Sequence, residues 1–280
     1  MTIQLGKMNS LVVNEIAYEG AYLTDDSGNG EVFLKKEEMP NGLAVKQVIE
    51  VFVFEEQGNL TATTKTPIAQ LGDFALLQVT SINAIGAFVD MGIGKELLVP
   101  YNEQRPKFEL SRSYLVHLYL DKASQRLCGS SNLNKFVKQE ATGFKKSQEV
   151  SIIVAGRTDL GFKVIVNNEY WGMVFTDQVF KPLFIGQKLQ AYVAKLREDG
   201  KLDIRLSKPG VAGSNELSDV IYDKLTQENG VIHLGDKSDP IAIKKAFGCS
   251  KANFKRAIGH LFKEGKIDLA ATKITLVELV

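Results

Sequence analysis

The sequence predicts a mainly β chain: three tandem five-stranded barrels followed by a smaller domain of helices and strands. Two observations carry this prediction. The first is an internal repeat, because residues 5–23 align without a gap on residues 71–89 and are identical at seven of nineteen positions. Self-similarity at a fixed offset is typical of repeated structural units. The second is a change of pattern at Ser214, where the alternation of strands gives way to helical spacing.

The barrels are justified by a pattern that recurs near the end of each repeat. Residues 51–64, 116–131 and 191–207 each contain an apolar strand, a polar turn and a second strand that ends in small hydroxylic residues. A third, more diverged copy also has a glycine-led strand at 161–166 and a strand at 171–175. Five short strands in each repeat of roughly 70 residues indicate a Greek-key barrel of the OB type. We expect these barrels at residues 1–66, 67–139 and 140–213.

The segment GIGK at residues 92–95 has two interpretations, a phosphate-binding loop or a β-hairpin turn. A phosphate loop of the nucleotide-binding type needs GxxxxGK[ST] between a buried strand and a helix. Here the strand-like ELLVP follows Lys95. The hairpin is therefore favoured, with Gly92 and Gly94 supplying turn conformations that other residues adopt only at a cost.

The tail, residues 214–280, predicts three helices and a β-hairpin. Helical spacing of apolar residues covers the first helix, which Gly230 ends. Asp239 and Pro240 open the second helix, and Ser250 is a candidate N-cap for the third. Two short strands, KIDLA and TKITLV, follow. This order is typical of a winged helix.

Composition limits the functional classes. The chain has 280 residues, a net charge of +1 and two cysteines without a CxxC motif, which favours buried thiols over disulfides or a cysteine zinc site. No apolar run is long enough to span a membrane and the start lacks a secretory pattern, so we expect a cytoplasmic protein without membrane contact. Charge is uneven: residues 1–66 carry 5 basic and 10 acidic residues, while residues 140–213 carry 11 and 8.

The motif IGAFVDMG…KELLVP, residues 85–100, resembles the core of the S1 RNA-binding domain. Three S1-like barrels followed by a winged helix resemble the conserved virulence factor B family of bacterial RNA-binding proteins over nearly the full length. The resemblance implies single-stranded RNA as the ligand, held mainly by bases stacking on aromatic side chains. The positively charged second to fourth domains should then supply most of the affinity, since phosphate contacts depend on Lys and Arg.

The resemblance also implies where RNA is bound. The stacking aromatic of GAFV is Phe88, a second aromatic often stands at Ile85, and the gapless offset carries Phe88 to Tyr22. The same step from Gly161 reaches Lys163 in the third barrel. The family's histidine corresponds to Lys35, Pro100 and Phe175, so no barrel has the complete pattern. Trp171 is either a second stacking residue or part of the core, and the final hairpins add Asp121, Arg126, Lys201 and Arg205.

The third helix of a winged helix often contacts nucleic acid. Four candidates lie at its start: Lys251, Asn253, Lys255 and Arg256. The alternative for these charges is a solvated helix face or a protein-binding surface.

Catalysis and cofactors are not expected. The carboxylates are scattered, the three histidines have no companions at ligand spacing, and neither GxSxG nor HExxH occurs. The leading hypothesis is an RNA-binding post-transcriptional regulator. Two alternatives are a winged-helix DNA-binding transcription regulator and a scaffold that binds the ribosome or RNA-processing proteins.

Overall fold

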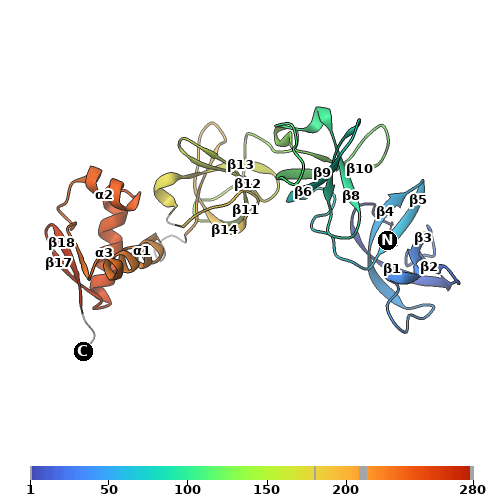
Figure 1. Cartoon of the computed structure of the whole chain (residues 1–280), viewed down its shortest axis with the longest axis horizontal. Helices are drawn as coiled ribbons and strands as arrows, with labels where there is room; N and C mark the ends of the chain where they lie inside the picture. Colours follow the sequence, from blue (N-terminus) through green and yellow to red (C-terminus); the bar gives the residue numbers. More distant parts are fainter. Residues whose placement is uncertain (1, 180, 208–212, 278–280) are drawn as a thin grey trace. The chain divides into compact units, whose positions relative to one another are not determined.

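A computed structural model describes residues 2–179, 181–207 and 213–277 of the chain. Figure 1 shows three β-rich domains and a helical C-terminal domain, in the order that the sequence predicts. The chain divides into two compact units, residues 1–136 and 137–280. The first unit contains two barrels, and the second contains one barrel and the helical domain.

The first barrel is closed and has the strand order β1-β2-β3-β5-β4. A parallel pair, β3 with β5, completes an otherwise antiparallel sheet, and a 3₁₀ helix, η1 (Lys36–Glu38), follows β3. Its strands are β1 (Met8–Ile16), β2 (Gly20–Thr24), β3 (Val32–Lys35), β4 (Val48–Glu56) and β5 (Asn59–Thr63).

The second barrel repeats this arrangement as a five-stranded sheet ordered β10-β9-β6-β7-β8. Its strands are β6 (Phe74–Ile82), β7 (Gly86–Asp90), β8 (Glu96–Pro100), β9 (Ser113–Leu120) and β10 (Leu127–Ser130). The 3₁₀ helices η2 (Tyr101–Glu103) and η3 (Leu133–Lys135) follow β8 and β10. Strands β6 and β7 start and end 66 residues after β1 and β2, so the gapless repeat is a repeat of strands.

The third barrel is closed, with the order β11-β12-β13-β15-β14 and a parallel pair of β13 with β15. Its strands are β11 (Glu149–Thr158), β12 (Gly161–Val166), β13 (Tyr170–Phe175), β14 (Lys188–Leu196) and β15 (Leu202–Arg205). A 3₁₀ helix, η4 (Thr176–Gln178), occupies the same place as η1. The diverged third copy is therefore a barrel of the same type.

One glycine per barrel explains why the second strands align. The first residue of β2, β7 and β12 is a glycine that lies opposite the end of the next strand. A Cβ atom at these glycines would lie 2.1, 2.4 and 2.1 Å from a carbonyl oxygen of that strand, so only glycine allows the close approach. The pairs are Gly20 with Lys35, Gly86 with Pro100, and Gly161 with Phe175.

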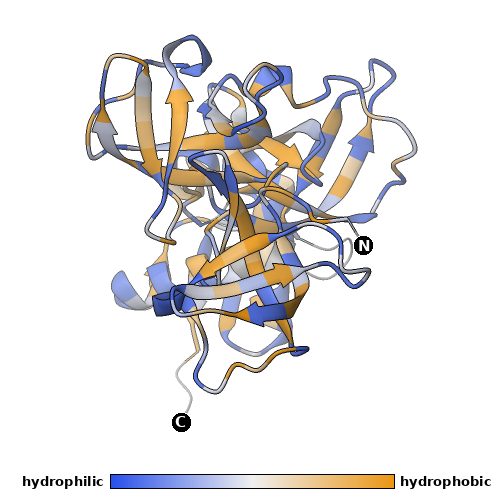
Figure 2. Cartoon of the chain, turned by 90° about the vertical axis from the view of Figure 1, so that its right-hand side faces the viewer, coloured by the Kyte–Doolittle hydropathy of each residue, from blue (hydrophilic) through white to orange (hydrophobic). Residues whose placement is uncertain are grey.

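Hydrophobic residues concentrate on the strands and hydrophilic ones on the connecting loops (Figure 2). Each barrel has its own buried cluster, but the cluster of the second barrel also contains Phe52 from β4, which is 1% exposed. Phe54 and Met8 pack against the same cluster. Strand β4 thus buries Val51 and Val53 in the first barrel and turns Phe52 toward the second, which joins the two barrels through apolar contact.

The C-terminal domain has the predicted winged-helix order, which confirms the expected fold class. The Ser250 side chain caps α3 by accepting from the Asn253 amide at 3.3 Å. Asp239 occupies the N-cap of α2 with Pro240 in the first turn, but its side chain makes no cap hydrogen bond. The elements are α1 (Gly213–Gln227), β16 (Val231–Ile232), α2 (Pro240–Phe247), α3 (Lys251–Lys263), β17 (Ile267–Ala270) and β18 (Lys273–Leu276). Strand β16, which pairs with β18, has no counterpart among the strands that the sequence predicts.

Candidate nucleic-acid interface

The three residues that the repeat makes equivalent do occupy one position in the three barrels. Tyr22, Phe88 and Lys163 each lie two residues after the close-approach glycine, and each is half-buried. The residues that follow them in the chain, Leu23, Val89 and Val164, are fully buried in the barrel cores. Because successive side chains of a strand point to opposite faces, these three side chains lie on the outer face.

In the second barrel, Phe88 lines a hollow in the surface with residues of the β7–β8 hairpin. The hollow also contains Lys95, whose backbone oxygen accepts from the Met91 amide and so closes that hairpin. This confirms GIGK as a hairpin turn, with Gly92 and Gly94 at φ of 77° and 74°. Lys95 thus lines the same hollow as the candidate stacking ring. The full lining is Thr80, Phe88, Asp90, Gly94, Lys95 and Glu96.

Ile85 lies at the turn that leads into β7 and is 58% exposed. The same turn is fixed by the Tyr101 hydroxyl, which donates to the backbone oxygen of Asn83 at 2.6 Å. Pro100, at the family's histidine position, lies opposite Gly86. An exposed apolar side chain therefore lies close in sequence to Phe88, but the structure does not place it in the hollow.

In the first barrel, Tyr22 contacts Phe33 of the neighbouring strand, with ring centroids 5.3 Å apart. Lys35, opposite Gly20, forms an ion pair with Glu56 at 3.0 Å. Glu56 is also paired with Lys95 of the second barrel. These two lysines lower the pKa of Glu56, Lys95 contributing more than Lys35.

In the third barrel, the outer face combines cations with aromatic rings. The Lys163 ammonium lies 3.6 Å from the centroid of the Trp171 ring, and burial lowers the pKa of Lys163. Trp171 is only 8% exposed, which favours packing over stacking for this residue. Its Nε1 is buried without a hydrogen-bond partner among the described residues. Phe175 is half-buried, and the Cζ atom of the Arg197 guanidinium lies 5.7 Å from the centroid of its ring.

The hairpin candidates differ in what they contact. Asp121 accepts from the Ser124 amide and hydroxyl, both at 2.8 Å, and these bonds lower the pKa of Asp121. It therefore stabilises the β9–β10 turn, which is a structural role and not the RNA contact that the resemblance implies. Arg126 pairs with Glu55 of the first barrel at 2.9 Å.

In the third barrel, Lys201 pairs with Asp199 at 2.7 Å, and both side chains are exposed. Arg205 is half-buried, and its Nε has no partner among the described residues. Arg197, which is not among the residues expected from the sequence, is held by Asp203 through two contacts of 2.9 and 3.0 Å.

The four winged-helix candidates have contacts within the chain. Lys251 donates to the Ser238 backbone oxygen at 2.9 Å, and Asn253 donates to the Asp177 backbone oxygen at 3.1 Å. Lys255 pairs with Asp236 at 3.2 Å. Arg256 donates to the Asn253 side chain at 2.9 Å. Lys255 and Arg256 are exposed, whereas Lys251 and Asn253 are partly buried. Each of the four residues at the start of α3 thus already contacts another residue of the chain.

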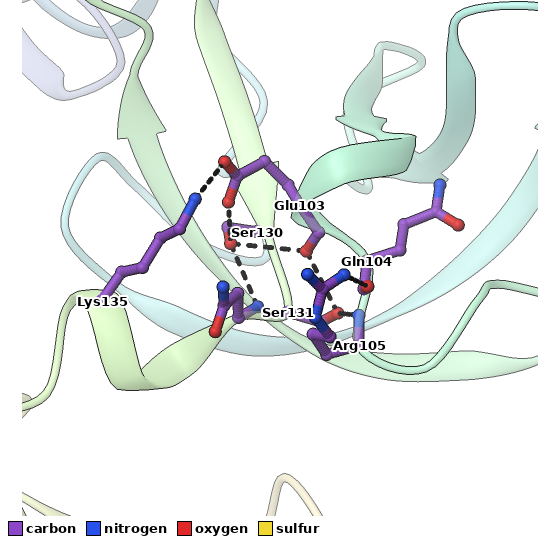
Figure 3. Close-up of polar contacts among 7 residues, drawn as sticks. Glu103, Gln104, Arg105, Ser130, Ser131 and Lys135 are labelled. Carbon is purple, nitrogen blue, oxygen red and sulfur yellow. Dashed lines mark hydrogen bonds and ion pairs between the residues drawn. The ribbon is translucent and has the colours of Figure 1, made fainter.

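The hydroxylic residues at the ends of the last barrel strands bind the glutamate that ends a 3₁₀ helix. In the second barrel, the buried Glu103 accepts from the Ser130 hydroxyl at 2.6 Å and pairs with Lys135 at 2.5 Å (Figure 3). The Ser131 hydroxyl accepts from the Arg105 amide at 2.6 Å, which ties the same segments together.

The first barrel has the same arrangement of a hydroxyl, a glutamate and a lysine. Glu38 accepts from the Thr63 hydroxyl at 2.8 Å and pairs with Lys65 at 3.1 Å. Glu38 and Glu103 each end the 3₁₀ helix that follows the third strand of their barrel, where the third barrel has Gln178. The hydroxylic strand ends are visible in the sequence, but no local pattern identifies Glu38 and Glu103 as their hydrogen-bond partners.

Within the described ranges, no group of three or more His, Cys, Asp or Glu side chains is placed to hold a metal ion. Cys128 and Cys249 are free and buried, and burial raises the pKa of each thiol to about 11. No helix in the described part of the chain is long and apolar enough to cross a membrane.

Comparisons with known proteins match both ends of the chain to families. The S1 domain family matches residues 5–65, and the CvfB-like winged helix domain matches residues 219–276. The Bacillus subtilis protein YitL is 26% identical over 94% of this chain and 90% of its own length. Conserved virulence factor B of Staphylococcus aureus strain RF122 is 28% identical over 89% of this chain and 87% of its own length.

Among solved structures, a multidomain protein with nucleic acid binding domains from Streptococcus pneumoniae is 24% identical. It covers 98% of each chain with a TM-score of 0.42. The S1 match in the first barrel and the winged-helix match in the tail support nucleic-acid binding. The chain thus carries an S1 domain and a CvfB-like winged helix domain, and its resemblance to the conserved virulence factor B family is confirmed over most of its length.

Proposed function

We propose that the chain is a non-catalytic RNA-binding protein that holds single-stranded RNA on the outer faces of its barrels and regulates gene expression post-transcriptionally in the cytoplasm. The observation that carries this proposal is the hollow of the second barrel, where Phe88 and Lys95 lie together. An aromatic face and an ammonium group match the base and the phosphate of one nucleotide. Unpaired bases are needed for stacking, so a single strand fits this site better than a duplex.

Charge supports the same choice. A duplex-binding protein usually presents a strongly basic surface. This chain has a net charge of +1, and the four winged-helix candidates already have contacts inside the chain. RNA rather than DNA, and regulation rather than another use of binding, are supported by the S1 match and by the virulence-factor relatives.

The test is a fluorescence anisotropy titration of the full chain with labelled single-stranded RNA, single-stranded DNA and duplex DNA of equal length. We expect single-stranded RNA to bind at least about tenfold tighter than duplex DNA. The salt slope should reflect about three or four phosphate contacts, which is a slope near −2 to −3 for a single strand. Preference for the duplex would favour a DNA-binding regulator. No binding at low salt would favour a protein-interaction scaffold.

A further inference from the structure

A single carboxylate lies between two lysines from different barrels. The Oε2 atom of Glu56 is 3.0 Å from the Lys35 ammonium, and its Oε1 atom pairs with the Lys95 ammonium. Lys35 ends β3 of the first barrel, whereas Lys95 belongs to the β7–β8 hairpin of the second. Two ammonium groups thus converge on one group that has two charged oxygens.

Each lysine comes from a segment that neighbours a candidate stacking residue. Lys95 lines the hollow that contains Phe88. Lys35 is opposite Gly20, the residue that leads into the strand carrying Tyr22. Lys95 is also held over the Phe54 ring, at 5.0 Å from its centroid, and Phe54 packs against the core cluster of the second barrel. The position of the Lys95 cation is therefore set by the packed junction of the barrels.

The ion pairs of Glu56 with Lys35 and Lys95 are weak enough for another anion to replace the carboxylate. The side chains of Lys35, Lys95 and Glu56 are 45%, 36% and 26% exposed, so water and salt screen these ion pairs. Glu56 stands at the end of β4, next to the turn, and its carboxylate can swing away without disturbing the core. A phosphodiester carries the same charge and also has two oxygens that can accept from both ammonium groups.

We propose that Lys35 and Lys95 form a phosphate subsite for single-stranded RNA that spans the first two barrels, and that the Glu56 carboxylate fills this subsite until RNA displaces it. The proposal rests on the proposed function and specifies it further. It gives the acidic first barrel a role in RNA binding, because this barrel supplies Lys35 and its Glu56 carboxylate competes with the RNA phosphate for the two cations.

The test uses the full chain and a labelled single-stranded RNA, titrated at several salt concentrations. Glu56→Gln removes the competing charge and keeps the size of the side chain. We expect it to tighten RNA binding about two- to tenfold, the equivalent of the two weak ion pairs that RNA no longer has to break. The salt slope should steepen by up to about 0.7, because in the parent chain the freed Glu56 carboxylate offsets part of the cation release that accompanies phosphate binding.

The matched control is Glu50→Gln. Glu50 lies on the same strand, is exposed, and hydrogen-bonds only to Ser10 among the described residues, so the variant changes the net charge equally. It should change affinity by less than about twofold. In the Glu56→Gln background, Lys35→Gln and Lys95→Gln should each cancel the gain. In the parent chain, each lysine variant should weaken binding about two- to fivefold.

Several results would overturn the inference. If the parent chain binds RNA and Glu56→Gln binds no better than Glu50→Gln, the carboxylate does not compete and the proposed function is untouched. Weaker binding by a folded Glu56→Gln chain would mean that Glu56 supports the site. If Glu56→Gln does not fold, unchanged RNA binding by both single lysine variants overturns the inference. If neither the parent chain nor Glu56→Gln binds any RNA, the proposed function itself fails.

Discussion

The second and third barrels share one frame and present different outer faces. In both, a glycine leads the second strand against the end of the third strand, and a bulge interrupts the first strand. Yet the outward position two residues after that glycine is Phe88 in one barrel and Lys163 in the other. A second position also differs. The first strand of each barrel begins opposite the fourth strand, where the partner residue is His117 in the second barrel and Tyr192 in the third.

The difference shows which positions the fold constrains. A glycine that lies against a carbonyl oxygen cannot be exchanged without moving the backbone, whereas an outward side chain can be exchanged without disturbing the core. In the second barrel the outward residue is a ring that lines a hollow together with Lys95, where we expect a base and a phosphate to bind. In the third barrel the outward lysine covers Trp171, so we expect RNA contact there to depend more on charge than on stacking.

The largest expected effect tests the shared frame. A Cβ atom at Gly161 would lie 2.1 Å from the Val174 oxygen and 2.9 Å from the Phe175 Cα atom. Gly161→Ala should therefore destabilise the third barrel by about 3 kcal/mol, since backbone has to move. Urea unfolding followed by the fluorescence of Trp171, the one tryptophan of the chain, measures this barrel directly.

The control for that substitution lies on the neighbouring strand. Gly156 pairs with Lys163, and nothing lies within 4 Å of a Cβ atom built there. Gly156→Ala should change the free energy of unfolding by about 0.5 kcal/mol or less. Equal effects at the two glycines would show that the close approach does not define the frame.

A smaller effect should separate the second barrel from the third through pH. The His117 ring lies between Phe74 and Phe136, at centroid distances of 4.4 and 4.2 Å, and burial lowers its pKa to about 4. The unfolded chain then binds a proton that the folded chain rejects. Stability contributed by neutral His117 is complete above pH 6.5 and is lost as the pH falls toward 4. Because the ring is only half-buried, we expect a loss of about 2 kcal/mol.

His117→Tyr places the third-barrel residue in the second barrel and removes this titration. The pH dependence of urea unfolding by circular dichroism should be shallower for the variant between pH 6.5 and 4. Acidic residues such as Glu38 titrate in both proteins and cancel in the difference. A parallel pH dependence of the two chains would mean that His117 is protonated without cost in the folded state.

Much of the fold could be predicted because local sequence patterns determine where its strands and helices begin and end. The offset of 66 residues predicts β6 and β7 from β1 and β2, and the glycine at 161 predicts β12. Helix caps and apolar spacing predict the three helices of the tail. Each of these signals acts within a few residues of the chain, or repeats, and needs no knowledge of distant contacts.

The candidate site was less predictable because its key contacts join distant residues. The sequence VFVFEE shows a strand that is apolar on both faces, which signals a covering neighbour but does not say that Lys95 meets Glu56 there. The burial of Trp171 under Lys163 depends on strand pairing. The internal contacts of Lys251 and Asn253 depend on loops that no short pattern positions.

The central claim is that the outer face of the second barrel binds single-stranded RNA, and neighbouring residues of β7 test it. Phe88→Ala should weaken RNA binding by about 1–2 kcal/mol, the value of one base on a half-buried ring, with little change in melting temperature. Val89 is fully buried, so Val89→Ala should instead lower stability by about 1–3 kcal/mol and leave RNA binding by the folded chain intact. Anisotropy titrations and thermal melts of the two full-length variants would contradict the account if Phe88→Ala melted the barrel, or if it bound RNA as tightly as the parent chain.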